Sequence, residues 1–367
     1  MQLPTDQFSW IMQLIFIVLF FVMYLYGTRL QAYVWTKQVE SAATQLEALA
    51  AQGKQLSLRM LKDLGVEERE IKATVDDFME FFTIEPVSLD PAGVLSRLEH
   101  LLDVRTHRYE AEIARVAPKA TPEQAGNAES VLSAAMALYY IFRVVRHFVI
   151  LGKKTKSIYS ILQIQMQMPE IMRIAKAYFE AVRAFADGKP IGDGMGALAI
   201  AHLAREVDAG KPEEIAEHTI ALSGKFEGRS LLFVRAKGYG SQTGKPGEAI
   251  RLLVNRAKGK VARIITVDAG MKLEGEETGQ VIEGVGAAIG DPGPEKFKME
   301  DSGVKYDIPI DAIIIKESIE DALCPMKKAL VDAVPKVIER IKNAIRLRTK
   351  KGDTIVVAGI GNTIGIA

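Results

Sequence analysis

The N-terminal segment from Phe8 to Tyr26 constrains this chain more than any other stretch. It contains no charged residue, and it is about as long as a helix needs to be to cross the hydrocarbon core of a bilayer. A cleaved signal peptide would have a basic residue before the apolar run and small residues after it, whereas here Asp6 precedes the run and Arg29 follows it. We therefore predict a retained transmembrane helix, with residues 1–35 as the anchor.

The residues that flank this segment predict its orientation. Trp10 lies near one end and Tyr24 and Tyr26 near the other, as aromatic residues do at the two membrane interfaces. Arg29 and Lys37 follow the span, and no Lys or Arg precedes it. By the positive-inside rule, the chain is expected to be a single-pass protein of the cell membrane with its C-terminal domains in the cytoplasm.

Charge and cysteine content exclude several classes of protein. The sequence has 47 Lys and Arg against 46 Asp and Glu, and no basic run is interleaved with aromatic residues, so we expect no nucleic-acid partner. The single cysteine, Cys324, rules out an internal disulfide framework and a thiolate-cluster metal site.

Residues 36–188 have helical periodicity almost throughout, and we interpret them as a stalk. Helices are expected over 66–82, 90–117, 128–151 and 157–187, with Asp90 as the N-cap of the second. The third is very apolar, but Arg143 and Arg146 follow after about a dozen residues, too few for a second span. Such an apolar face favours self-association, so we expect a homo-oligomer.

From residue 189 onward, glycine is frequent and short apolar runs alternate with helical patterns. This alternation predicts an α/β domain over 189–367 with a mostly parallel sheet. Strands are expected over 231–234, 264–267, 312–315 and 354–358, and helices over 197–207, 212–222, 247–257 and 319–348.

Two aspartates stand where α/β domains place functional groups. Asp268 ends the apolar run that starts at Arg263, and sites in open α/β sheets form at the carboxyl ends of strands. The alternative, that Asp268 only caps a turn, stays open. Asp193 opens the helix expected at 197–207. His202 and His218 lie on helical patterns, which favours surface or core positions over ligand roles.

Four motifs in this domain resemble the spore germination protease family and, more distantly, the hydrogenase maturation endopeptidases. They are Gly359-Ile-Gly361-Asn362, Asp193-Gly-Met-Gly196, Thr243-Gly244 with Glu248, and Val267-Asp268-Ala269 followed by Gly284-Val285-Gly286. The first two form one loop in that family, but here they stand at opposite ends of the domain, in an order that resembles a circular permutation. We therefore expect Asn362 to lie next to Asp193.

This resemblance implies a fold and a site. The fold would be a permuted three-layer sandwich of the phosphorylase/hydrolase-like kind, and the catalytic pair would be Asp193 and Asp268. The same resemblance implies that other motif residues contact the substrate, namely Gly359, Gly361, Asn362, Thr243 and Gly286. No cofactor is expected. The alternative is a divalent metal held between the two aspartates, although the histidine that completes the metal site in the maturation endopeptidases has no counterpart after His218.

The whole chain, with the phrase from Phe82 to Pro91, also resembles an archaeal membrane-protein family of unknown function. Two functions therefore remain open. One is a membrane-anchored endopeptidase, aspartic-type or metal-assisted, with an unknown protein or peptide substrate. The other is a non-catalytic homo-oligomeric scaffold, or a protein that binds a ligand or partner, because one fold hosts many functions.

Overall fold

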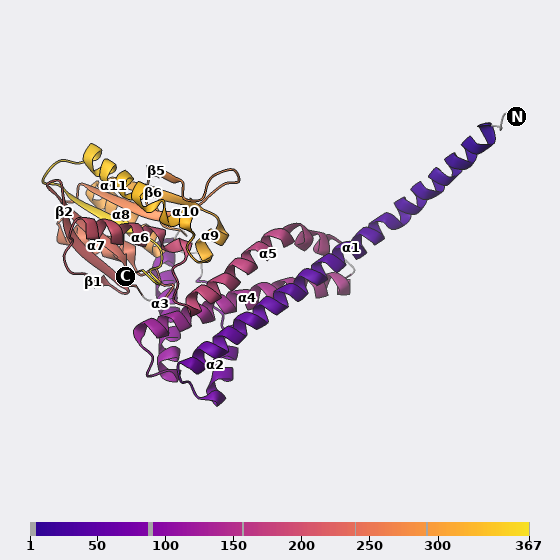
Figure 1. Cartoon of the computed structure of the whole chain (residues 1–367), viewed down its shortest axis with the longest axis horizontal. Helices are drawn as coiled ribbons and strands as arrows, with labels where there is room; N and C mark the ends of the chain where they lie inside the picture. The colour runs from indigo at the N-terminus through magenta and orange to yellow at the C-terminus, as the bar shows by residue number, and fades with distance from the viewer. Residues whose placement is uncertain (1–4, 87–90, 156–157, 239, 291–292, 367) are drawn as a thin grey trace.

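Five helices form the N-terminal half of the chain (Figure 1). The computed structural model describes residues 5–86, 91–155, 158–238, 240–290 and 293–366. The helices are α1 (Thr5–Asp63), α2 (Glu68–Glu80), α3 (Pro91–Val116), α4 (Pro122–Thr155) and α5 (Ile158–Ala186). Helices were expected in all of these regions, although α4 begins earlier than expected and the expected N-cap of α3, Asp90, lies outside the described residues.

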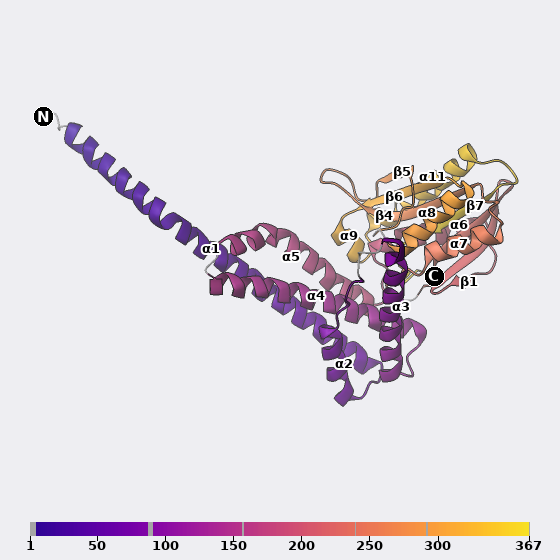
Figure 2. The same ribbon diagram turned by 180° about the vertical axis from the view of Figure 1, so that it is seen from behind.

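Helix α1 changes its surroundings sharply along its length. From Trp10 to Tyr24 every side chain is exposed, and this part of the helix projects away from the body of the molecule (Figures 1 and 2). From Val39 onward one face of the same helix is buried against α4 and α5. One continuous helix therefore joins an unpacked apolar segment to the core of the bundle.

Helix α4 begins earlier than expected. Residues 121–126, which precede the expected helix over 128–151, contain the N-terminus of α4: the N–H of Gln124 donates to the Thr121 hydroxyl, and the N–H of Thr121 donates to the Gln124 side chain. This reciprocal capping satisfies two backbone groups that a helix start leaves unpaired.

Helix α4 also corrects the argument that rejected a second span. Among the described helices, α4 is long and apolar enough to cross a membrane. The parts of α1 over Trp10–Tyr24 and Arg29–Asp63 are long and apolar enough only when they are taken together. In the structure, 33% of the most apolar stretch of α4 is buried. Leu132 and Leu138 pack in the core that α4 shares with Leu46 of α1 and Ala181 of α5. The apolar composition of α4 is thus used, at least in part, for helix packing.

The C-terminal half is an α/β domain. Its strands are β1 (Glu213–Ala216), β2 (Thr219–Phe226), β3 (Arg229–Ala236), β4 (Arg263–Met271), β5 (Val281–Val285), β6 (Ile310–Glu317) and β7 (Thr354–Gly359). Its helical elements are η1 (Gly192–Gly194), α6 (Met195–Glu206), α7 (Pro246–Arg256), α8 (Pro294–Tyr306), α9 (Ile319–Leu323), α10 (Lys328–Val331) and α11 (Val334–Arg348). Helices α6 and α11 pack on one face of the sheet and α7 and α8 on the other.

The sheet is mixed, which corrects the expectation of a mostly parallel one. Its order is β1-β2-β3-β7-β4-β6-β5, and only β3, β7, β4 and β6 run parallel. The expected helix over 212–222 is instead the hairpin of β1 and β2, which turns at His218 with a φ of 51°. Local composition favoured a helix, but all of β2 pairs with β3.

Two further expectations differ. The expected helix over 319–348 is divided into α9, α10 and α11, because Pro325 and Pro335 cannot continue a helix from the preceding turn. Helix α8 was not expected at all.

The buried face of α4 can be tested with one matched pair of substitutions. Leu138 is 1% exposed and Tyr140 is 68% exposed. Leu138→Asp should destabilise the bundle by about 3 kcal/mol or more, because it buries an unpaired charge. Tyr140→Asp should change the stability by less than about 0.5 kcal/mol. Thermal melting of both variants in mild detergent measures the difference, and equal, severe damage by Tyr140→Asp would indicate that this face lies in lipid instead.

Candidate functional site

Asp268 lies inside the central part of the sheet. It belongs to β4, between β7 and β6, and its nearest backbone partner in β6 is Ile314. Strand β7 ends at Gly359, which pairs with Val267, so Asp268 stands just beyond the end of its neighbour. The sequence placed Asp268 at the tip of its strand, whereas β4 continues through Met271. Asp268 is 6% exposed.

Asp193 is held by the last residues of the chain. It lies in η1, immediately before α6. The side-chain amide of Asn362 donates to Asp193 Oδ2 over 2.8 Å, and the backbone N–H of Asn362 donates to the same oxygen over 3.2 Å. This contact confirms the expectation that the two ends of the domain meet at one loop.

Glycines allow these segments to approach. A Cβ on Gly361, whose φ is 110°, would lie 1.9 Å from the carbonyl oxygen of Asp193. A Cβ on Gly196 would lie 2.2 Å from the carbonyl oxygen of Val267, and one on Gly359 would lie 2.4 Å from that of Gly196. No side chain fits at such distances, so the glycines set how closely the loop, α6 and the ends of the strands can pack.

Glu317 is a third carboxyl group near the carboxyl ends of these strands, and the sequence analysis missed it. It is the last residue of β6, it is 2% exposed, and neither of its carboxyl oxygens has a hydrogen-bond partner among the described residues. It lies against η1, because a Cβ on Gly192 would be 2.6 Å from Glu317 Oε2. The sequence could have predicted this position, because Glu317 stands at the end of an apolar strand, as Asp268 was expected to do.

Burial and mutual repulsion keep protons on two of these groups. Burial, followed by the negative charge of Asp193, raises the pKa of Asp268 to about 8. Burial, followed by the charges of Asp193, Asp321 and Asp268, raises the pKa of Glu317 to about 9. At neutral pH Asp268 and Glu317 therefore keep their protons, and a protonated carboxyl group can act as a general acid.

Asp321, the neighbour of this cluster, has a structural role. Burial opposes its ionisation, but the ion pair with Lys327, the hydroxyl of Thr278 and the N–H of Ser318 outweigh burial and lower its pKa. Asp321 also completes a capping box with Ser318 at the start of α9. It is thus fully used in holding this loop.

The structure separates two residues that the sequence grouped with the site. Gly286 follows β5 and donates its N–H to Ile310 at the start of β6, so it lies at the opposite end of that strand from Glu317. Thr243 lines a cavity beside α3 and α4. By contrast, Gly359, Gly361 and Asn362 do meet Asp193 and α6.

The described residues form no ready-made metal site. In the ranges that the structure describes, no group of three or more His, Cys, Asp or Glu side chains is arranged to hold a metal ion. His202 is exposed on α6, and His218 lies in the turn of a β-hairpin. A metal between Asp193 and Asp268 would therefore have to recruit further ligands.

The buried proton of Asp268 predicts an inverted pH dependence of stability. An unfolded Asp has a pKa of about 3.9, so the folded state holds this proton more tightly, and stability present below about pH 4 is lost as the pH rises towards 8. Asp268→Asn carries no charge and should exceed the wild type at pH 8 by at least about 1.4 kcal/mol, the equivalent of one pKa unit. The difference should close below about pH 4. Denaturant unfolding in detergent measures it, with exposed Asp301→Asn as the control, and a variant less stable than wild type at pH 8 would contradict the assignment.

Both halves of the chain match one family. A model described as the N-terminal domain of a protein of unknown function (DUF1512) matches residues 13–188. A second, described as the C-terminal domain of unknown function (DUF1512), matches residues 191–367. No curated protein matches the chain. Because the two matches follow each other in order along the chain, the protein belongs to the DUF1512 family.

Proposed function

We propose that this protein is a membrane-anchored hydrolase that cleaves a peptide bond with Asp193 and Asp268. One observation carries the proposal: Asn362 holds Asp193 beside a buried Asp268 that keeps its proton to about pH 8. The motif resemblance to the germination proteases supports a peptide as the substrate class.

In this proposal Asp193 acts as the general base and Asp268 as the general acid. Asn362 occupies Asp193 Oδ2 with two hydrogen bonds, which leaves Oδ1 to accept a proton from a water molecule. The water oxygen then attacks the carbonyl carbon, and the proton of Asp268 passes to the departing amine as the C–N bond breaks. Glu317 is neutral at pH 7, because its pKa is about 9, so it adds no negative charge next to the pair.

The proposal includes three functional units: an anchor over 1–35, a helical stalk over 36–188 and the α/β domain over 189–367. The exposed apolar surface from Trp10 to Tyr24 supports the anchor, because water would not favour so long an unpacked apolar helix. The resemblance to an archaeal membrane-protein family supports it too. The basic residues after the span support a cytoplasmic stalk and α/β domain, by the positive-inside rule.

A second function, a non-catalytic homo-oligomeric scaffold, is favoured by one observation. Asp268 is almost entirely buried, and Asp193 is half-buried, so a substrate would reach the pair only after the surrounding loop moved. If the two aspartates have only a structural role, this movement of the loop is not needed.

Substitution of the pair tests the hydrolase. Asp268→Asn and Asp193→Asn should each lower cleavage of a fluorogenic peptide library by about 100-fold or more, because the amide cannot donate or accept the proton. The double variant should be hardly worse than either single one, since the two groups act as a unit. Wild-type activity should fall above about pH 8, where Asp268 loses its proton. Activity that survives both substitutions would show that this pair is not catalytic, and the absence of cleavage by the wild type would favour the scaffold.

Deletion of residues 2–26 tests the anchor separately. The full-length protein should sediment with membranes and need detergent for extraction, whereas the shortened protein should stay in the supernatant. The wild-type protein treated with high salt is the control, because salt releases proteins that are attached only by charge. Recovery of the full-length chain without detergent would overturn the anchor and leave the hydrolase proposal untouched.

A further inference from the structure

A cavity of about 450 Å³ lies between the helical region and the α/β domain, away from the aspartate pair. Its walls come from α3, α4, the turn between β1 and β2, the loop before α7 and the start of α8. The volume is within the range that small-molecule sites occupy, and such sites are common between domains.

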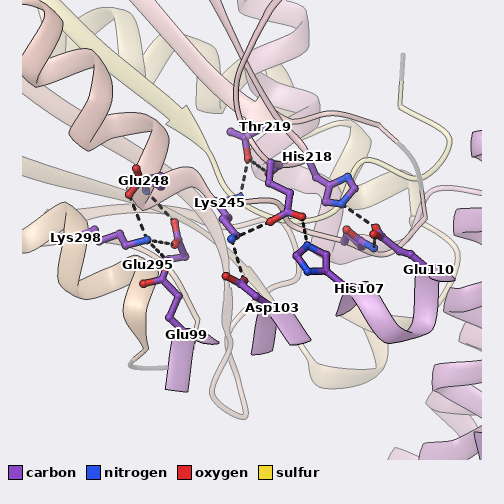
Figure 3. A network of polar contacts seen from close by, with 12 residues as sticks. Glu99, Asp103, His107, Glu110, His218, Thr219, Lys245, Glu248, Glu295 and Lys298 are labelled. Atoms are coloured by element: carbon purple, nitrogen blue, oxygen red, sulfur yellow. Dashed lines mark hydrogen bonds and ion pairs between the residues drawn. The ribbon is translucent and has the colours of Figure 1, made fainter. Parts of the chain in front are cut away.

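Ion pairs between the two domains hold the cavity in shape (Figure 3). Lys245 of the α/β domain contacts Asp103 of α3 over 2.9 Å and Glu217 over 2.8 Å. Lys298 of α8 pairs with Glu99 of α3, and His107 of α3 pairs with Glu217. Because these pairs fix both walls, the cavity exists before any ligand arrives.

The charges on the lining select against anions. Five carboxylates line the cavity, and the lysines and arginines among the lining residues are Arg105 and Lys245. Lys245 already forms ion pairs with two carboxylates, which neutralise its charge and leave it little attraction for an anionic ligand. The carboxylates are Glu99, Asp103, Glu129, Glu217 and Glu295.

Glu129 differs from the other four carboxylates. Its hydrogen-bond donor is the neutral amide of Gln242, over 3.1 Å, whereas each of the others contacts a lysine. Burial is the largest influence on this group and raises its pKa to about 7, Gln242 and Arg105 lower the pKa, and Glu110 raises it. Arg105 acts on Glu129 through its charge alone, so a cation in direct contact would further favour the ionised carboxylate.

The lining also has an apolar part. Leu102, Tyr109 and Met136 contribute it, and the hydroxyl of Tyr109 is already turned towards the Met136 sulfur. We propose that this cavity binds a small organic amine, with its ammonium group on Glu129 and its hydrocarbon part against Tyr109 and Met136. The inference does not rest on the hydrolase.

Binding should release protons, with a defined pH dependence. Glu129 must ionise to pair with the ammonium, so affinity should rise between pH 6 and 8 and level off above that, while an alkyl amine stays protonated. The charged groups that act on Glu129 are Arg105 and Glu110 of α3, and the imidazole of His218, in the β1–β2 turn, contacts Glu110.

Calorimetry of the full-length protein in detergent tests the proposal with three probes of one shape: hexylamine, 1-hexanol and hexanoate. Hexylamine should bind at least tenfold more tightly than the other two and should release up to about half a proton at pH 7, measured in buffers of different ionisation enthalpy. Glu129→Gln should abolish the proton release and weaken hexylamine binding at least tenfold. The matched control is Glu123→Gln, an exposed residue of the same helix, which should change neither.

Met136→Trp provides a second variant that leaves the charges in place. It should block all three probes by filling the cavity, and thermal melting verifies that it still folds. Hexanoate binding more tightly than hexylamine, hexylamine binding equally to Glu129→Gln, or no binding of hexylamine at all would each overturn the proposal.

Discussion

The position of β7 is the constraint on which the α/β domain depends. This strand is the last in the sequence, yet it lies between β3 and β4 at the centre of the sheet. The residues that follow it, through Asn362, then bind the first loop of the domain at Asp193. The sheet cannot be completed until the end of the chain is in place, and such non-local pairing is slow to form. The same connection that completes the core also builds the candidate site.

Three carboxyl groups at one edge of a sheet are an unfavourable arrangement for stability alone. Asp268 and Glu317 are removed from water with no cationic partner among the described residues, and the negative charge of Asp193 raises the pKa of both. Asp321 shows how the same fold treats a structural acid, with a lysine, a hydroxyl and a backbone N–H around it. The contrast between these environments is what makes Asp193, Asp268 and Glu317 the candidate functional group.

The helical region contributes more than a stalk. Ile364, near the C-terminus, and Leu323 of α9 pack with the helical core, so the bundle covers the side of the domain where Asp193 lies. Helix α3 supplies one wall of the interdomain cavity and its ion pairs. A motion of the helical bundle would therefore affect both the loop around Asp193 and the interdomain cavity.

The sequence by itself determined the elements with strong local patterns. These include the apolar start of α1, the helices α2 to α5, the strands β3, β4, β6 and β7, and the meeting of Asn362 with Asp193, which followed from a split motif. Tertiary structure alone decided the β1–β2 hairpin, the mixed sheet, the burial of α4, the burial of Glu317 and the cavity between α3, α4 and the α/β domain. The physical reason is that periodicity reports which face of an element is apolar, whereas strand pairing, proton affinity and cavity shape depend on neighbours distant in sequence.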